Sequence, residues 1–578
     1  MTTHNLRSLF TSGVGLAALL VAVPAIWTQE AQPPQADPNA APAGLEELAR
    51  GPVHEAFAEP AHGQAKAAPV VGKQPPDPIE EVPPDQKPDA EGVQWLPGYW
   101  AFDEEKQNYL WVSGFWRVPP PGRQWVPGHW NAVDGGWQWV AGFWMVPQQQ
   151  AQEVTYLAPP PEPIEVAPSV PAPSADHVYV AGCWVWRDTR YVWRPGYWYA
   201  PRAGWVWVPA HYNWTPCGYV FVEGYWDYTL RDRGMLFAPV YVDVAVCYRP
   251  GWYYQPRVVV ATDCMVTAMF VRPGYSCYYF GDYYEPCHRQ AGFVAIVDVR
   301  VGGCRDPLFA YCRYEHRADP RWEVSFTAGY AGRYSGEIAR PPRTFVQQTT
   351  IVNNVTNVTN VTNVNNTTIN NTNINNVKNV QNNSMVSTIN QVQNNNTIKL
   401  KQVTPEEKQQ HVVAAKQVAQ ASVQRTQLET EARSRGVPTK PTDAPRVMKM
   451  DLPKPPAAAQ SAVRTPPTTA PPAGHPAGTT TPATGAHPAA NVTAPPHPGA
   501  PGTGAAVTTP AAKTTPPPGH TTPPPPRPGS PAGQTGTQPS AGKTVPDKKT
   551  PPPHPAPPDA KHKADDKKDK DKDKDKRN

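Results

Sequence analysis

A six-residue motif with an aromatic ring at each end recurs through the middle of the chain. One copy reads WVPGHW and begins at Trp125. The eight copies form two blocks of four, return every 14 to 16 residues within a block, and begin at Trp95, Trp111, Trp125, Trp139, Tyr179, Trp193, Trp207 and Phe221. Self-similarity at a short fixed period indicates a repeat architecture. A unit this short cannot bury a core alone, so rings that each bury roughly 150–250 Å² must be shared between neighbours.

The motif is predicted to lie in β-hairpins. Asp134-Gly135 separates two aromatic runs, and Asp-Gly is a strong hairpin signal because a type I′ turn needs positive φ. Positions 1 and 6 have opposite parity, so on a flat strand their rings would face opposite sides. Gly at position 4 permits a bulge or bend that brings both rings to one side. Ala210 replaces this Gly in WVPAHY, which favours a close ring-to-backbone contact over left-handed geometry.

The rings have two interpretations. In the structural one, each copy clamps its neighbour and the Gly lets a ring lie against bare backbone. In the functional one, some rings stay exposed as a platform for sugars or a cage for quaternary ammonium groups. The motif residues concerned are Trp95, Gly98, Trp100, Trp111, Gly114, Trp116, Trp125, Gly128, Trp130, Trp139, Gly142, Trp144, Trp193, Gly196 and Trp198.

These motifs resemble those of the bacterial YXWGXW (WXXGXW) repeat proteins. The resemblance rests on YVWRPGYW (191–198), WQWVAGFW (137–144) and YLWVSGFW (109–116), with RGMLFAPVYVD (233–243) as a companion, and covers about residues 92–380. It implies an exported protein of unknown activity and carries over no catalytic residue.

The N-terminus and the cysteines both favour export. Residues 1–27 have the form of a signal peptide or N-terminal anchor, because Arg7 precedes an apolar run, and no other stretch is predicted to span a membrane. An even number of cysteines in an exported chain suggests disulfides. The best single pair is Cys277 with Cys287, across an expected hairpin turn at Gly281-Asp282. The disulfide candidates are Cys183, Cys217, Cys247, Cys264, Cys277, Cys287, Cys304 and Cys312.

Composition divides the rest of the chain. Residues 28–91 are predicted to be a disordered linker and residues 148–177 a Pro-rich linker. The linkers flank repeat block 1 (92–147) and repeat block 2 (178–232), and a Cys-rich β segment follows at 233–345. These boundaries predict a protease-resistant fragment covering roughly residues 92–345.

The C-terminal half contains one predicted helix. Residues 346–400 are an Asn/Thr/Val low-complexity stalk whose period of three fits neither helix nor simple strand. The stalk is either a polar tract prone to β-association or an extended repeat, and self-association through residues 351–380 is expected. A capping box at Thr404 opens a helix over residues 405–435. Residues 436–578 are predicted to be a disordered Pro/Ala/Thr-rich tail with a Lys/Asp end.

The expected fold class is mainly β, with short antiparallel aromatic repeats, a Cys-rich β segment, one C-terminal helix and long disordered arms. A net charge of +5 does not indicate a nucleic-acid partner. No catalytic, cofactor or metal motif is present, since GxSxG, HExxH, phosphate loops and CxxC are all missing. The sequence predicts an exported, non-enzymatic structural or interaction protein of the bacterial envelope, in the periplasm, at the cell surface or outside. The alternative is a glycan or cell-wall binding module, and the expected partner is an envelope protein or polysaccharide.

Overall fold

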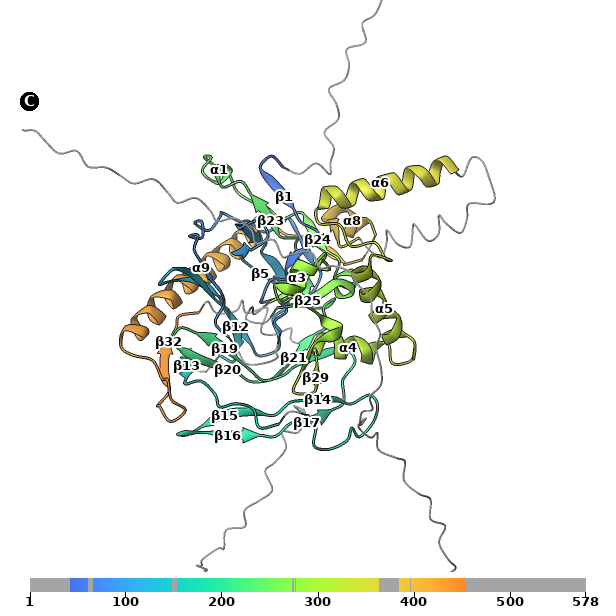
Figure 1. The fold of residues 1–578 in the computed structure, drawn as a ribbon. Helices are drawn as coiled ribbons and strands as arrows, with labels where there is room; N and C mark the ends of the chain where they lie inside the picture. The colour runs from blue at the N-terminus through green and yellow to red at the C-terminus, as the bar shows by residue number, and fades with distance from the viewer. Residues whose placement is uncertain are drawn as a thin grey trace, which may run out of the picture. The chain divides into compact units, whose positions relative to one another are not determined.

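The computed structural model describes residues 42–60, 66–147, 153–165, 167–272, 275, 277–362, 384–395 and 397–452 (Figure 1). The predicted signal or anchor at residues 1–27 and most of the predicted tail lie outside the described residues. The described part is mainly β, with 32 short strands and eight α-helices. No helix in these ranges combines the length and apolar composition needed to cross a membrane.

The eight motifs pair into four antiparallel hairpins, so two copies make one structural unit. In each hairpin the two inner strands meet at a turn, and the two outer strands continue the same register beyond motif positions 3 and 4. Hairpin 1 consists of β5 (Gln94–Leu96), β6 (Tyr99–Asp103), β7 (Asn108–Val112) and β8 (Phe115–Arg117); hairpin 2 of β9 (Gln124–Val126), β10 (His129–Val133), β11 (Gly136–Val140) and β12 (Phe143–Met145). Hairpin 3 consists of β14 (Val178–Val180), β15 (Cys183–Arg187), β16 (Arg190–Arg194) and β17 (Tyr197–Tyr199); hairpin 4 of β18 (Trp205–Val208), β19 (His211–Thr215), β20 (Gly218–Val222) and β21 (Tyr225–Tyr228).

The predicted turn at Asp134-Gly135 is confirmed, but its type is not. Val133 pairs with Gly136, which leaves a two-residue turn. Gly135 has a φ of 87°, whereas the non-glycine residues with positive φ in the described part are Gln107 and Asp188. Because a type I′ turn needs positive φ at both central residues, this turn is of another type.

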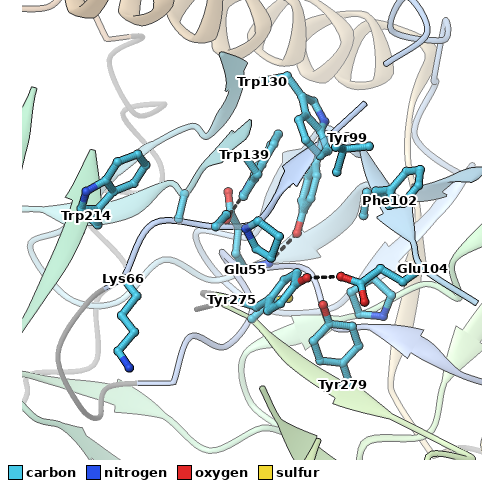
Figure 2. A pocket seen from close by; sticks show the side chains of 17 residues that line it. Glu55, Lys66, Tyr99, Phe102, Glu104, Trp130, Trp139, Trp214, Tyr275 and Tyr279 are labelled. Atoms are coloured by element: carbon cyan, nitrogen blue, oxygen red, sulfur yellow. Dashed lines mark hydrogen bonds between the residues drawn. The ribbon is translucent and has the colours of Figure 1, made fainter. Parts of the chain in front are cut away.

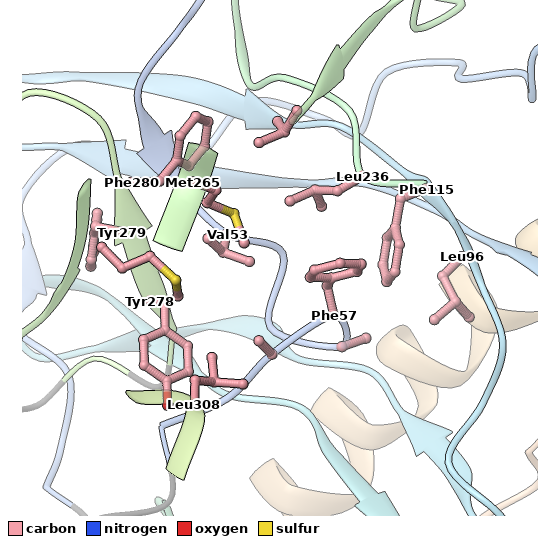
Figure 3. Packing of buried hydrophobic residues seen from close by; sticks show 14 of the residues in the cluster. Val53, Phe57, Leu96, Phe115, Leu236, Met265, Tyr278, Tyr279, Phe280 and Leu308 are labelled. Atoms are coloured by element: carbon pink, nitrogen blue, oxygen red, sulfur yellow. The ribbon is translucent and has the colours of Figure 1, made fainter. Parts of the chain in front are cut away.

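The prediction that residues 28–91 are a disordered linker is wrong for 42–60 and 66–91. These residues form β1 (Leu45–Glu47), β2 (Gly51–Pro52), β3 (Val70–Val71) and β4 (Gln86–Pro88), which pair with β23, β26, β11 and β31. Val53 and Phe57 have no exposed surface and lie in the main core, where the Phe57 ring packs beside Phe115 (Figure 3). The apolar residues of these segments are few and follow no regular period, so the local sequence does not indicate a strand or a helix. Their strands form by pairing with strands from elsewhere in the chain.

The predicted Pro-rich linker 148–177 also contains a paired strand. β13 (Glu153–Leu157) lies between β20 and β32 (Arg446–Lys449) in a four-stranded sheet, and buries Tyr156 completely. The sheet joins repeat block 2 to the end of the described chain, so the linker prediction is wrong for these residues.

Residues 233–345 form short strands with helices between them, rather than a β segment. The strands are β22 (Gly234–Met235), β23 (Val240–Val242), β24 (Val258–Val260), β25 (Met269–Val271), β26 (Tyr278–Phe280), β27 (Val294–Ala295), β28 (Arg300–Val301) and β29 (Cys304–Arg305). The α-helices are α1 (Val244–Cys247), α2 (Thr262–Met265), α3 (Pro286–Gln290), α4 (Pro307–Glu315) and α5 (Trp322–Ser335).

The Cys277–Cys287 pair is wrong because its hairpin does not form. β26 pairs with β25 and β2, and the chain after Gly281 enters α3 instead of turning back. Gly281 has a φ of 97°, and a Cβ there would lie 2.7 Å from the Cα of Arg50, so the N-terminal segment occupies the place of a returning strand. All eight cysteines are free thiols in the structure, with Cys287 exposed and Cys217 buried.

The C-terminal prediction is correct for a helix over residues 405–434 and wrong for the described residues of the stalk. α9 (Pro405–Ser434; labelled in Figure 1) begins as expected, with the Thr404 side chain accepting the Glu407 N–H. It packs across β5, β9 and β10. It is not the only helix, because α6 and α8 precede it. The stalk residues form α6 (Phe345–Thr362), β30 (Val386–Thr388), α8 (Ile389–Asn394) and β31 (Leu400–Gln402), and β30 and β31 pair with β24 and β4. The residues between 363 and 383 lie outside the described part, so self-association through 351–380 stays a prediction.

Candidate functional site

Each hairpin holds two cross-strand ring pairs of one geometry. Position 1 of one copy pairs with position 6 of the other, as Trp95 pairs with Trp116 and Trp100 with Trp111. The eight pairs have ring centroids 5.0–5.5 Å apart. The remaining pairs are Trp125–Trp144, Trp130–Trp139, Tyr179–Trp198, Trp184–Trp193, Trp207–Trp226 and Tyr212–Phe221. The predicted packing of rings between neighbouring copies is confirmed.

The ring at position 1 lies directly on the Gly at position 4 of the paired copy. A Cβ on Gly142 would come within 2.3 Å of the Trp125 ring, and one on Gly128 within 2.5 Å of the Trp139 ring. Position 4 has no positive φ in any copy. The Gly is therefore required for close approach, as the clamp interpretation predicts, and not for a left-handed backbone.

Hairpin 4 explains the one copy that lacks this Gly. The ring that pairs with the Ala210 copy is Phe221, which is the smallest ring at position 1. Tyr179 still needs a Gly, because a Cβ on Gly196 would come within 2.0 Å of the Tyr179 hydroxyl oxygen. Phe lacks that hydroxyl, so the Ala methyl group fits beneath it.

The rings form no exposed platform in the described part of the chain. None of its 19 tryptophans is exposed, and Trp95, Trp116 and Trp144 are 2% exposed or less. Hairpin 3 is the most open, since Trp184, Trp193 and their neighbours are half-buried.

Regular strand pairing stops at positions 3 and 4, so backbone groups there need partners from elsewhere. In hairpin 1 the partner is Glu81. Its carboxylate accepts the Gly98 N–H at 2.7 Å, the Gly114 N–H at 2.8 Å and the Trp111 indole N–H at 3.1 Å. One carboxylate thus bridges both motif copies of the hairpin.

Hairpins 2 and 3 bind a glutamate in the same place. Glu55 accepts the Gly142 N–H at 3.0 Å and the Trp139 indole N–H at 3.2 Å. Glu165 accepts the Gly196 N–H at 2.9 Å and the Tyr179 hydroxyl at 3.1 Å. In all three hairpins the acceptor comes from an irregular segment outside the hairpin, which we call a glutamate segment: residues 53–59, 77–86 and 162–165.

The carbonyl groups and indoles of the hairpins are also matched from outside. Arg425 of α9 donates to the carbonyls of Pro127 and Ala141 at 2.9 and 2.8 Å, and its guanidinium is fully buried. Four of the indole N–H groups at position 6 bind the backbone of a glutamate segment, namely those of Trp100, Trp116, Trp144 and Trp184. Trp100 donates to the Asp77 carbonyl and Trp184 to the Glu162 carbonyl, both at 2.9 Å, whereas Trp130 and Trp198 donate to carbonyls outside these segments. Hairpins 1, 2 and 3 therefore each bind an irregular segment that offers backbone carbonyls and one carboxylate.

Burial dominates the protonation of two of these glutamates. It raises the pKa of both Glu55 and Glu81 to about 7, while the N–H donors around each carboxylate act in the opposite direction. Their charge is therefore sensitive to pH near neutrality.

Hairpin 4 differs because no glutamate side chain in the described part accepts its Gly224 or Ala210 N–H. In the first copy of hairpins 2 and 3, a Cβ on Gly128 would lie 2.7 Å from the Glu55 carboxylate, and a Cβ on Gly182 would lie 2.9 Å from the Glu165 carboxylate. Ala210 places a Cβ at the corresponding position, which excludes a carboxylate. Loss of the Gly thus accompanies loss of the carboxylate from the position-4 N–H groups. Hairpin 4 contacts Glu59 through side chains instead: the Tyr225 hydroxyl donates to this carboxylate at 3.2 Å, and His211 Nε2 lies 3.3 Å from it.

A small aromatic cavity adjoins the hairpin 2 site (Figure 2). It encloses about 60 Å³, and Tyr99 and Trp139 stack in its wall with centroids 4.7 Å apart. Cys277 also lines it, but burial raises the pKa of this thiol to about 12, so the thiol is neutral and a poor nucleophile. The described residues include no group of three His, Cys, Asp or Glu side chains placed to hold a metal.

Two larger grooves lie beside the glutamate segments. One, of about 640 Å³, lies between hairpin 1, hairpin 2 and α9 and is lined in part by residues 74–78. The other, of about 590 Å³, lies between hairpins 3 and 4 and is lined in part by residues 159–163. Both volumes fall within the roughly 300–1,000 Å³ of ligand sites.

The glutamate residues were missed because they lie in the segments predicted to be linkers. A signal was present: PPDPIE at 75–80 and PPEPIE at 160–165 precede the two repeat blocks. Glu81 and Glu165 each stand 14 residues before the first ring of their block. The internal repeat therefore includes the glutamate segment as well as the rings.

Comparison with protein families identifies the hairpins. A family model described as "WXXGXW repeat (2 copies)" matches residues 125–145, 175–199 and 202–227. These ranges coincide with hairpins 2, 3 and 4, so the two copies of the family unit are the two motifs of one hairpin. The comparisons with curated proteins and with solved structures gave no match. The chain therefore contains WXXGXW repeats, and each repeat unit folds as one aromatic hairpin.

Proposed function

We propose that the protein is an exported, non-enzymatic interaction protein of the bacterial envelope, whose aromatic hairpins hold irregular, proline-flanked acidic segments. The observation that carries the proposal is the common binding mode of Glu55, Glu81 and Glu165. In three hairpins a carboxylate accepts the Gly N–H of the second copy and an N–H or O–H from a ring at position 1, each time from an irregular segment outside the hairpin. Recognition by backbone contacts and one charged anchor is typical of peptide-binding modules.

Hairpin 3 offers the sharpest test. A variant with residues 160–165 replaced by Gly and Ser removes its glutamate segment. The peptide PPEPIEVAPS should then bind this variant, and a peptide with Gln in place of the glutamate corresponding to Glu165 should bind at least tenfold more weakly. The parent protein, whose site is filled, is the control. Equal binding of the Glu and Gln peptides would contradict carboxylate recognition.

The envelope location is a separate part of the proposal. It rests on the signal-like N-terminus and on the cysteine usage of the sequence. Cell fractionation followed by N-terminal sequencing tests it. Recovery from the cytoplasm with residue 1 intact would contradict export.

A glycan-binding module is the alternative, and the half-buried rings of hairpin 3 favour it most. Burial of the other rings weighs against a flat platform, so a sugar would have to enter one of the two grooves. Soluble cell-wall fragments, added in the peptide experiment, distinguish the two functions.

A further inference from the structure

The groove between hairpins 3 and 4 has a donor-rich aromatic lining. Trp193, Tyr199 and Tyr219 line it, and the hydrogen bonds of the described part include none from their indole or hydroxyl groups. One wall is itself proline-rich, namely residues 159–163. The groove therefore presents aromatic faces, together with N–H and O–H groups that have no acceptor among the described residues.

A polyproline ligand has the complementary chemistry. Proline has no backbone N–H, so a proline run offers only carbonyl acceptors and flat apolar rings. The left-handed polyproline helix makes no internal hydrogen bonds, and aromatic-lined grooves recognise it at low entropic cost. The chain already shows this chemistry in the Trp184 indole, which donates to the Glu162 carbonyl of a proline-rich segment.

We infer that this groove binds the proline run of the chain's own C-terminal tail, TTPPPPRP at residues 521–528. Residues 523–526 are the longest uninterrupted proline run in the sequence. Arg527 follows it, and the acidic side chains of Glu162 and Glu165 line the groove. The one arginine in the lining, Arg305, is 2.8 Å from Glu323 and is thereby paired. Shape, hydrogen bonding and charge thus favour the same segment.

The tail is long enough to reach the groove. The described chain ends at Leu452, and 126 residues follow it. Of these, 68 residues separate Leu452 from Thr521, and a coil of 68 residues spans about 45 Å root-mean-square. Tethering to the same chain gives an effective concentration in the millimolar range for a well-matched span, so a weak site suffices for occupancy. The inference rests on the proposed peptide-binding function but uses a different groove and a different ligand feature.

The test uses full-length protein and a fluorescein-labelled peptide of residues 519–530. In a tail variant, serine replaces Pro523 to Pro526 and leaves the groove free. The peptide should bind this variant, measured by fluorescence anisotropy, at least tenfold more tightly than it binds the parent. No binding to either protein would overturn the inference, and equal binding would show that the tail is not the occupant.

Matched substitutions locate the site. Tyr219→Ala in the tail variant should weaken peptide binding at least tenfold, and Tyr219→Phe should weaken it severalfold through loss of the hydroxyl donor. Trp137→Ala is the control, because Trp137 holds the same motif position in hairpin 2 and lines the other groove. Equal losses in Tyr219→Ala and Trp137→Ala would overturn the assignment to this groove. A glycan could bind the protein, lose this binding in Tyr219→Ala, and be displaced by neither the peptide nor the tail. That result would assign the groove to sugars instead. Binding of the peptide PPEPIEVAPS to hairpin 3 tests the carboxylate site independently of the proline groove. The proposed peptide-binding function and this inference can therefore fail separately.

Discussion

At the scale of single residues, ring size and Cβ size are matched across each hairpin. Trp or Tyr at position 1 lies on Gly, and Phe221 lies opposite Ala210. The sequence predicted this contact, since Ala at position 4 argued against left-handed geometry. It did not predict that the same Cβ decides whether a glutamate can enter, because the glutamate comes from a distant segment.

Gly128→Val should destabilise the protein by about 1–3 kcal/mol, as overpacking of a core does. The added side chain would meet the Trp139 ring at 2.5 Å and the Val140 carbonyl at 2.8 Å. Gly72→Val is the control, since nothing lies within 4 Å of a Cβ there and its φ is not positive, so a change within about 0.5 kcal/mol is expected. Chemical denaturation of both variants measures this. Trp125→Ala, which truncates a buried ring, should cost about 3–5 kcal/mol in the same experiment.

The match between Phe221 and Ala210 can be tested by a double-mutant cycle. Phe221→Trp alone should destabilise the protein by about 1–3 kcal/mol, because the larger ring meets the Ala210 methyl group. Adding Ala210→Gly should recover most of that loss, which gives a favourable coupling energy. Additive effects of the two substitutions would contradict ring-to-Cβ matching.

At the scale of elements, the hairpin was predictable and its ligand was not. Alternating aromatic residues around Asp134-Gly135 indicate antiparallel strands from local sequence alone. Glu55 and Glu81 lie in Pro- and Ala-rich sequence that has no regular spacing of apolar residues, and local patterns of this kind indicate disorder. Only the tertiary contact, three N–H donors converging on Glu81, reveals their role.

The buried glutamates should make stability depend on pH. The pKa of Glu81 is about 7 in the folded protein and 4.5 in the unfolded chain. Between these two pH values, only the unfolded state loses the proton. The free energy of unfolding should therefore fall as pH rises from 4.5 to 7 and level off above, by on the order of 3 kcal/mol for this residue. Glu81→Gln should flatten the curve measured by denaturation at pH 5, 6, 7 and 8. Parallel curves for parent and variant would contradict this assignment.

At the scale of the whole molecule, segments distant in sequence complete the repeat blocks. The glutamate segments lie on the N-terminal side of their blocks, whereas Arg425 comes from α9, almost 300 residues beyond the carbonyl of Pro127 that it binds. Composition could not predict such partners, because each contributes only a few buried residues between polar ones. The domain boundaries inferred from composition were therefore too narrow on both sides.

The isolated fragment 92–345 should consequently fail to fold cooperatively. It lacks Glu81 and Glu55, which accept the N–H groups of Gly98 and Gly142 in the full chain. It also lacks α9, whose Arg425 donates to the carbonyls of Pro127 and Ala141. Each buried polar group without a hydrogen-bond partner costs about 1–3 kcal/mol. The sum over several such groups is comparable to the roughly 5–15 kcal/mol that stabilises a typical domain. A fragment of residues 42–452 keeps all of these partners and is the matched control. Limited proteolysis of the full-length protein should leave a resistant fragment that covers about residues 42–452. Thermal unfolding of the two fragments, followed by near-ultraviolet circular dichroism, should show a sharp transition for 42–452 alone. A sharp transition of equal midpoint in fragment 92–345 would show that the hairpins need neither the glutamates nor α9, and would contradict the receptor role assigned to them.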